Sequence, residues 1–149
     1  MAAFLCRFLQ RGMKMFYRSG RLEEIAEAAM KEFDDLAYLD DPECRIAYQF
    51  CDLEKKNHNQ LVFADCETIK DKYKEFMPYD YIITFYEPNC AALDDERLKR
   101  VMYHELKHVG WEGDGKFRIT PHNVEDFREC IEKWGLDWIK PDKDATEAP

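Results

Sequence analysis

Residues 104–108 place two histidines four residues apart, with Glu105 directly after the first of them. On an α-helix, His104 and His108 lie on the same face about one turn from each other, so both imidazoles can reach one metal ion. Two neutral nitrogen ligands and an open coordination position suit Zn²⁺. Glu105 lies one step round the helix, close enough to take a proton from a water molecule at that metal. The spacing therefore predicts the centre of a zinc hydrolase.

A metal site built on two histidines needs a further ligand from the protein. His122 is the favoured third ligand, because Thr120 and Pro121 form a typical helix start that places His122 in the first turn of the next helix. Glu125 or Asp126, one turn further along, is the alternative third ligand. Either carboxylate could instead act as an outer partner that orients His122.

Two tyrosines near the motif are candidates for stabilising an oxyanion. Tyr103 directly precedes His104, and Tyr86 ends a predicted strand. Either hydroxyl could donate a hydrogen bond to a developing negative charge. Aromatic residues in such positions more often serve packing. The fourth histidine, His58, lies in a polar turn and is expected to be an exposed loop residue outside the site.

The elements that must position these residues follow from the hydrophobic periodicity. Apolar residues at helical spacing predict a helix over 21–36, and a second helix that begins at Asp94 and stops near Gly110 carries the two histidines. Between them, apolar and alternating runs predict strands over 45–52, 60–67 and 80–87. The polar turn at 55–59 is expected to join the first two strands as a hairpin.

The last predicted helix runs from Thr120, as its N-cap, to Gly135. Its expected buried stripe consists of Val124, Phe127, Ile131 and Trp134. The fold class is therefore α+β, in the order helix, small three-stranded sheet, metal helix and ligand-bearing helix. We expect a basic N-terminal extension over 1–19, one domain over 20–140 and a disordered tail over 141–149.

The composition of the chain limits the classes of function. Its 149 residues are 46% hydrophobic and 36% charged, which suits one folded domain. The net charge of −9, with acidic and basic residues interleaved, argues against nucleic acid as a partner, which requires clustered Lys and Arg. No apolar run approaches the roughly 18 residues of a membrane span. The six cysteines include no C-x-x-C pair, so we expect reduced thiols in a cytosolic protein.

Several stretches of the chain together resemble one known family. These are an aspartate-led strand over 78–86, the helix with its histidine motif over 93–108, the segment 121–136, and the early helix that begins at Leu22. The resemblance covers about residues 20–138, and it is to the phage-type metallopeptidases, which are small zincin-like domains. Where the family commonly has His-Asp-Val, this chain has Asn123 after His122, which removes an acidic partner at that position.

The resemblance implies a minimal zincin-like fold with Zn²⁺ on His104 and His108, Glu105 as the base and His122 as the third ligand. It also implies a cytoplasmic location in a bacterial host cell. The first hypothesis is thus a zinc-dependent metallopeptidase whose third strand, over 80–87, borders the cleft and pairs with an extended peptide or protein substrate. The alternative is a catalytically silent, zinc-stabilised module that binds another protein, in which all four metal positions are filled or the cleft is covered.

Overall fold

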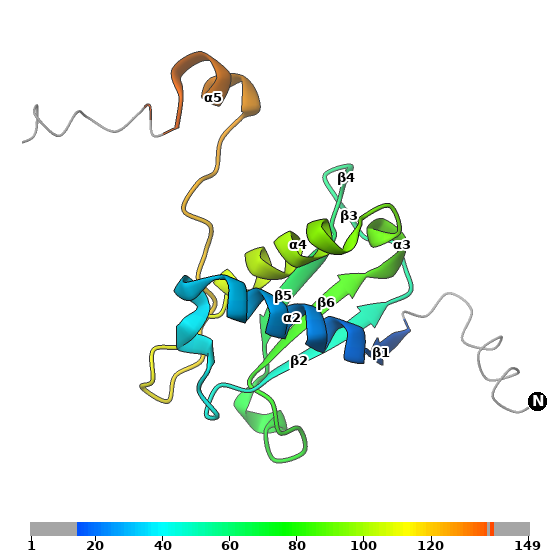
Figure 1. Cartoon of the computed structure of the whole chain (residues 1–149), viewed down its shortest axis with the longest axis vertical. Coiled ribbons are helices and arrows are strands. Elements are labelled where there is room, and N and C mark those ends of the chain that lie inside the picture. Colours follow the sequence, from blue (N-terminus) through cyan, green and yellow to red (C-terminus); the bar gives the residue numbers. More distant parts are fainter. Residues whose placement is uncertain (1–14, 137, 139–149) are drawn as a thin grey trace, which may run out of the picture.

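A small sheet with two long helices packed on one face forms the body of the protein (Figure 1). The computed structural model describes residues 15–136 and 138. In chain order, its elements are β1 (Phe16–Arg18), α2 (Gly20–Glu32), the 3₁₀ helix η1 (Asp34–Leu39), β2 (Ile46–Cys51), β3 (Lys56–Asn57), β4 (Gln60–Leu61), β5 (Ala64–Thr68), the 3₁₀ helix η2 (Asp71–Tyr73), β6 (Tyr81–Tyr86), α3 (Glu87–Cys90), α4 (Asp95–Lys107) and α5 (Arg128–Trp134). The α+β prediction is confirmed.

The order of the strands differs from the predicted hairpin. The sheet runs β1-β2-β6-β5, and β6 pairs in parallel with β2 on one side and antiparallel with β5 on the other. The prediction that the first and second strands form a hairpin was therefore wrong. The reason lies in burial, because β6 buries five of its six residues and so takes the interior position, whereas β5 is only partly buried. The turn at 55–59 instead belongs to the small β3–β4 hairpin, where His58 is exposed as expected.

The core lies between the sheet and the helices α2 and α4. Alternate residues of a strand point to the same face, so Ile83 and Phe85 of β6 share the helix-facing side with Tyr48 and Phe50 of β2. The helices bury their apolar residues at three- and four-residue spacing against this face. These helix residues are Leu22, Ala26 and Ala29 of α2 and Leu98, Met102 and Leu106 of α4.

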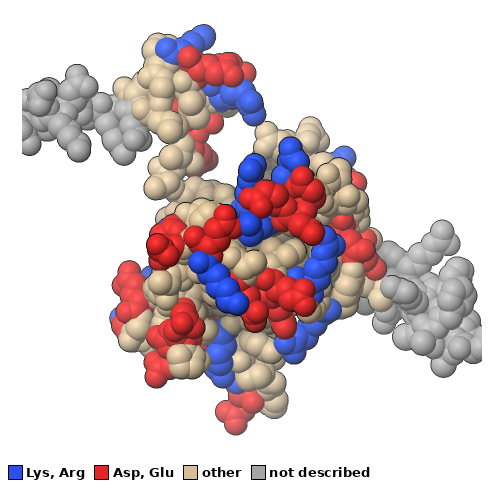
Figure 2. All heavy atoms as spheres, in the orientation of Figure 1, with Lys and Arg blue, Asp and Glu red and all other residues tan. Residues whose placement is uncertain are grey.

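Both long helices begin at side-chain caps. The Ser19 hydroxyl accepts from the Leu22 amide at the start of α2, and the Asp94 carboxylate accepts from the Arg97 amide at the start of α4, over 2.8 Å. The α2 helix ends at Glu32 and not at 36, because the next residues tighten into η1. Acidic and basic side chains are interleaved over the outer face shown in Figure 2. One of their ion pairs joins the two helices, from Arg21 to Asp95.

The predicted helix over 120–135 is present only in its last part. The structure forms α5 from Arg128 to Trp134, with Gly135 at its end as predicted, and residues 121–127 belong to no helix or strand. Thr120 does not cap a helix. The predicted buried stripe is also wrong at three of its positions, since Val124, Phe127 and Trp134 are 48%, 76% and 59% exposed. In Figure 1 this segment leads away from the sheet, so these side chains lie outside the core that the sheet forms with α2 and α4.

The N-terminal end of the described chain contributes a strand to the sheet. Residues 16–18, which the sequence analysis assigned to the N-terminal extension, form β1 and pair with β2 at the edge of the sheet. The rest of the predicted extension, over 1–14, and the predicted tail over 141–149 lie outside the described residues. Within the described part of the chain, no helix is long and apolar enough to cross a membrane.

Candidate metal centre

The metal helix predicted from the histidine spacing is α4. His104 and His108 lie on the same face, with ring centroids 5.1 Å apart. The C-terminal end of α4 is held by Tyr38 of η1, whose hydroxyl lies 3.2 Å from the Leu106 carbonyl oxygen and 2.8 Å from that of Val109. The Leu106 carbonyl also accepts from the Val109 amide, and the phenol lies within hydrogen-bond distance of both carbonyls, which stabilises the end of the helix that carries His108.

After α4 the chain forms a loop, and residues 118–120 return to pair with residues 108–110. The Gly110 amide donates to the Arg118 carbonyl over 2.9 Å, and the Thr120 amide donates to the His108 carbonyl over 2.7 Å. A Cβ atom at Gly110 would lie 2.7 Å from the Arg118 carbonyl oxygen, so only glycine allows this approach. The sequence analysis interpreted Gly110 as a helix stop, although α4 already ends at Lys107. The glycine two residues after His108 was the one sequence feature that could have indicated this close approach of the backbone.

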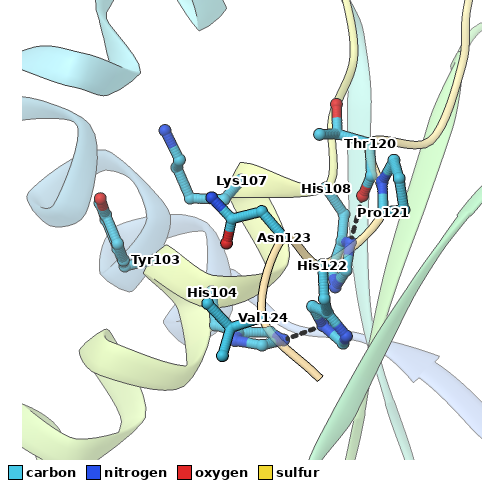
Figure 3. Close-up of a pocket in the computed structure, with 9 residues that line it drawn as sticks. All are labelled: Tyr103, His104, Lys107, His108, Thr120, Pro121, His122, Asn123 and Val124. Carbon is cyan, nitrogen blue, oxygen red and sulfur yellow. Dashed lines mark hydrogen bonds between the residues drawn. The ribbon is translucent and has the colours of Figure 1, made fainter. Parts of the chain in front are cut away.

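The returning segment, residues 118–122, brings His122 against the two histidines of α4 (Figure 3). The Nε2 atoms of His122 and His104 are 2.9 Å apart, and the His122 ring centroid lies 4.8 Å from that of His104 and 4.5 Å from that of His108. Each residue offers one ring nitrogen, and these nitrogens all lie within 4.8 Å of one another. The structure therefore brings together the three histidines that the sequence analysis favoured.

The surroundings of His108 and His104 suit a cation. The Nδ1 atom of His108 lies 2.7 Å from the Thr120 carbonyl oxygen, which can only accept. Nδ1 therefore carries the proton, and the lone pair of Nε2 is available to a metal. Burial, together with the nearby His108 and His122, lowers the pKa of His104 and so favours its neutral form.

Glu105 points away from solvent, beside the histidines. Its residue is 5% exposed, and its Oε1 atom lies 4.0 Å from Nε2 of His104. Burial, with a smaller contribution from the Asp65 carboxylate on β5, raises the pKa of Glu105 to about 7. A carboxyl group with a pKa near neutrality can both accept and return a proton.

Neither candidate tyrosine presents a free hydroxyl to the imidazoles. Tyr86 donates to the Asp65 carboxylate over 2.7 Å and lies 3.3 Å from the ammonium of Lys55, which also donates to Asp65 over 2.7 Å. Tyr103 donates to Asp35 over 2.6 Å, and Figure 3 shows its side chain well apart from the histidine rings. The sequence analysis did not single out Asp65, which lies one position from a core residue in an alternating strand pattern.

The two alternative ligands do not join the histidines. Asp126 accepts from the Trp138 indole over 2.6 Å and from the Phe127 amide over 2.8 Å. Glu125 is exposed and, like Asp126, is absent from the group of converging metal-ligand side chains, which within residues 15–136 and 138 consists of His104, His108 and His122.

A family model described as "Putative phage metallopeptidase" matches residues 14–146 of the chain. The chain belongs to this family. No curated protein and no solved structure matches the chain. Membership of a metallopeptidase family implies a metal, and the three histidines of this family member could hold one.

The donor set of this phage metallopeptidase family member, three imidazole nitrogens, is compatible with zinc and with other transition metals that bind imidazole. Imidazole nitrogens are preferred zinc ligands, and two of them at tetrahedral angles with bonds of roughly 2.0–2.1 Å lie about 3.3 Å apart. The 2.9 Å separation of the His104 and His122 nitrogens is close to that value.

A pocket of about 580 Å³ lies between α4 and the segment over 120–124. His104, His108 and His122 line it together with Tyr103 and Val124, and Figure 3 shows Tyr103 apart from the three imidazoles. The imidazoles of this family member are therefore open to a molecule of substrate size, as a catalytic centre requires.

Proposed function

We propose that the chain is a zinc-dependent metallopeptidase in which His104, His108 and His122 hold the ion and Glu105 is the general base. The convergence of three imidazoles beside one buried carboxylate carries this proposal. A family of metallopeptidases supplies the reaction class.

The number of ligands favours an enzyme over a zinc-stabilised binding module. A structural zinc site has four protein ligands, whereas a catalytic site has three and keeps one position for water or substrate. Within the described residues, the converging group has three members, all histidines. The pocket beside them gives substrate a route to the remaining position.

Zinc at this site would polarise the scissile carbonyl and lower the pKa of a water molecule near it. Glu105 would take a proton from the attacking water as its oxygen forms a bond to the carbonyl carbon. As the carbon–nitrogen bond breaks, Glu105 would pass that proton to the leaving amine. The burial that raises the pKa of Glu105 suits both transfers. Through the Thr120 carbonyl, the chain holds His108 in the tautomer that a metal requires.

We propose β5 as the strand that binds substrate, in place of the third predicted strand, β6. The third predicted strand, β6, is paired on both sides and has no edge to offer. The edge strand beside α4 is β5. In the β5–β6 ladder, Tyr86 donates to Phe63 and Ile69 donates to Asp80, so odd-numbered residues of β5 bond to β6.

It follows that Ala64, Cys66 and Thr68 direct their backbone amides and carbonyls to the free edge of β5. An extended peptide would pair with these groups, as in other strand-addition complexes. Because β5 carries Asp65, whose charge acts on Glu105, a peptide on this edge would run past the proposed base.

The test combines metal analysis with a cleavage assay. Protein purified without added metal is expected to contain close to one zinc per chain by elemental analysis. A mixed peptide library should be cleaved by this protein, lose cleavage on chelation and regain it with added Zn²⁺. Zinc binding without any cleavage would support the binding module instead.

A further inference from the structure

Tyr81, the first residue of β6, makes two hydrogen bonds to the backbone of a single residue. Its hydroxyl donates to the Arg118 carbonyl over 2.9 Å and accepts from the Arg118 amide over 2.9 Å. The residue is fully buried. A phenol has only one proton to donate, so Tyr81 uses that proton, together with an acceptor site, to hold the returning segment at Arg118.

Arg118 is the start of the pairing that leads to the third histidine. Its carbonyl also accepts from Gly110, and two residues later the Thr120 amide and carbonyl bond to the His108 carbonyl and Nδ1 atom. Val109 and Ile119 form an isolated bridge between these contacts. Tyr81 therefore joins the central strand of the sheet to the segment that positions one imidazole and leads to another.

The path from this pairing to His122 is short and has little other support. His122 follows Thr120 by two residues, with Pro121 between them restricting the backbone. Beyond that point, residues 121–126 make no backbone–backbone hydrogen bond within the described chain. The place of the His122 ring is accordingly determined by how the backbone is held at 118–120.

We infer that Tyr81 is a positioning residue for the third metal ligand: its hydroxyl fixes the returning backbone so that His122 meets His104 and His108. The inference rests on the zinc site of the proposed function. A role in packing alone is separable, because the Tyr81 ring packs edge-on to Phe117 with centroids 5.9 Å apart, and phenylalanine keeps that contact.

The test is Tyr81→Phe, with Tyr48→Phe as the matched control for a buried phenol on the neighbouring strand β2. Zinc affinity is measured by competition with a coloured chelator. We expect Tyr81→Phe to weaken affinity by about 10–100-fold, the usual effect of losing an outer partner of a ligand, and the control to leave it unchanged. The visible absorption of the Co²⁺-substituted variant should also change, since it reports coordination number.

The path of the effect is tested in a His122→Ala background. If Tyr81 acts through His122, adding Tyr81→Phe to His122→Ala weakens zinc binding no further. An equal loss in both backgrounds would overturn the inference, as would wild-type affinity in Tyr81→Phe. A parent protein that binds zinc but cleaves no peptide would contradict the proposed peptidase activity. It would leave the role of Tyr81 in zinc binding unaffected.

A measurement on chelator-treated protein needs no metal. Hydrogen exchange of the Arg118 and Thr120 amides should be faster in Tyr81→Phe than in the parent and unchanged in Tyr48→Phe. Unaltered exchange at these amides would contradict the inference. If Tyr81→Phe does not fold, Gly110→Ala disturbs the same pairing from its other strand, and it should weaken zinc binding in the parent but not in the His122→Ala background.

Discussion

His108 and Thr120 are joined twice, by the Thr120 amide donating to the His108 carbonyl over 2.7 Å and by the His108 ring at 2.7 Å from the Thr120 carbonyl. One histidine is thus oriented by the backbone that, two residues later, carries another. The geometry of the two ligands is coupled through the chain itself, so a change in one is felt at the other.

Glu105→Gln is expected to keep zinc and lose cleavage. Glutamine has nearly the shape of glutamate but cannot take a proton, so kcat should fall by about 10²–10⁴-fold while the metal content stays at the parent level. Peptide cleavage and elemental analysis measure the two effects on one sample. Glu129→Gln, an exposed change on α5, is the control. Parent-like turnover in Glu105→Gln would rule out this base.

His122→Ala is expected to weaken zinc binding by more than the roughly 10–100-fold that follows loss of an outer partner, because a direct ligand is lost. Chelator competition measures the affinity. Glu125→Ala and Asp126→Ala should bind zinc like the parent, since neither carboxylate joins the histidine group. Unchanged affinity in His122→Ala, with a loss in either carboxylate variant, would move the third ligand to that carboxylate.

Cys66→Pro is expected to weaken peptide binding while zinc binding is kept. Proline removes the outward amide of Cys66, which does not bond to β6, so KM should rise several-fold. Glu67→Pro is the matched comparison. Its amide bonds to β6, so this variant should lose about 1–3 kcal/mol of stability in thermal denaturation, because a carbonyl of β6 is left without its partner. Equal KM values in Cys66→Pro and the parent would exclude the free edge of β5 as the peptide site.

Gly110→Ala is expected to lower both stability and zinc affinity. The added Cβ would lie 2.7 Å from the Arg118 carbonyl oxygen, and relieving this contact should cost about 1–3 kcal/mol in the free energy of unfolding. Gly20→Ala meets nothing within 4 Å and serves as the control in the same denaturation series. A Gly110→Ala variant as stable as the parent would show that the segment at Arg118 can shift without a loss of stability.

The parts of the fold that depend on local pattern could be predicted from the sequence. Asp94 caps α4, and the four-residue spacing of His104 and His108 gives one helical face whatever the rest of the chain does. The parallel pairing of β2 with β6 could not be predicted, because it joins strands separated by about thirty residues of chain and depends on which strand buries both faces.

The failure at Thr120 has a specific cause. Thr120-Pro121 is a strong local signal for a helix start, but tertiary pairing uses both backbone groups of Thr120 for His108. His122 still reaches the other histidines, although by way of an extended return and not from a helix turn. The ligand could thus be named from composition and spacing, while its support depends on the long-range contacts of Tyr81 and Gly110 with Arg118, which no local motif indicates.

The arm that follows Thr120 exposes Val124, Phe127 and Trp134, and among the described residues no backbone–backbone hydrogen bond joins residues 121–126 to the rest of the protein. Most domains attach such an arm by burying its side chains. Here the proposed zinc ion would attach the arm, since it would link the histidines of α4 to His122 near the start of the arm. Metal supply would then govern how firmly the last part of the protein is attached, as well as its chemistry.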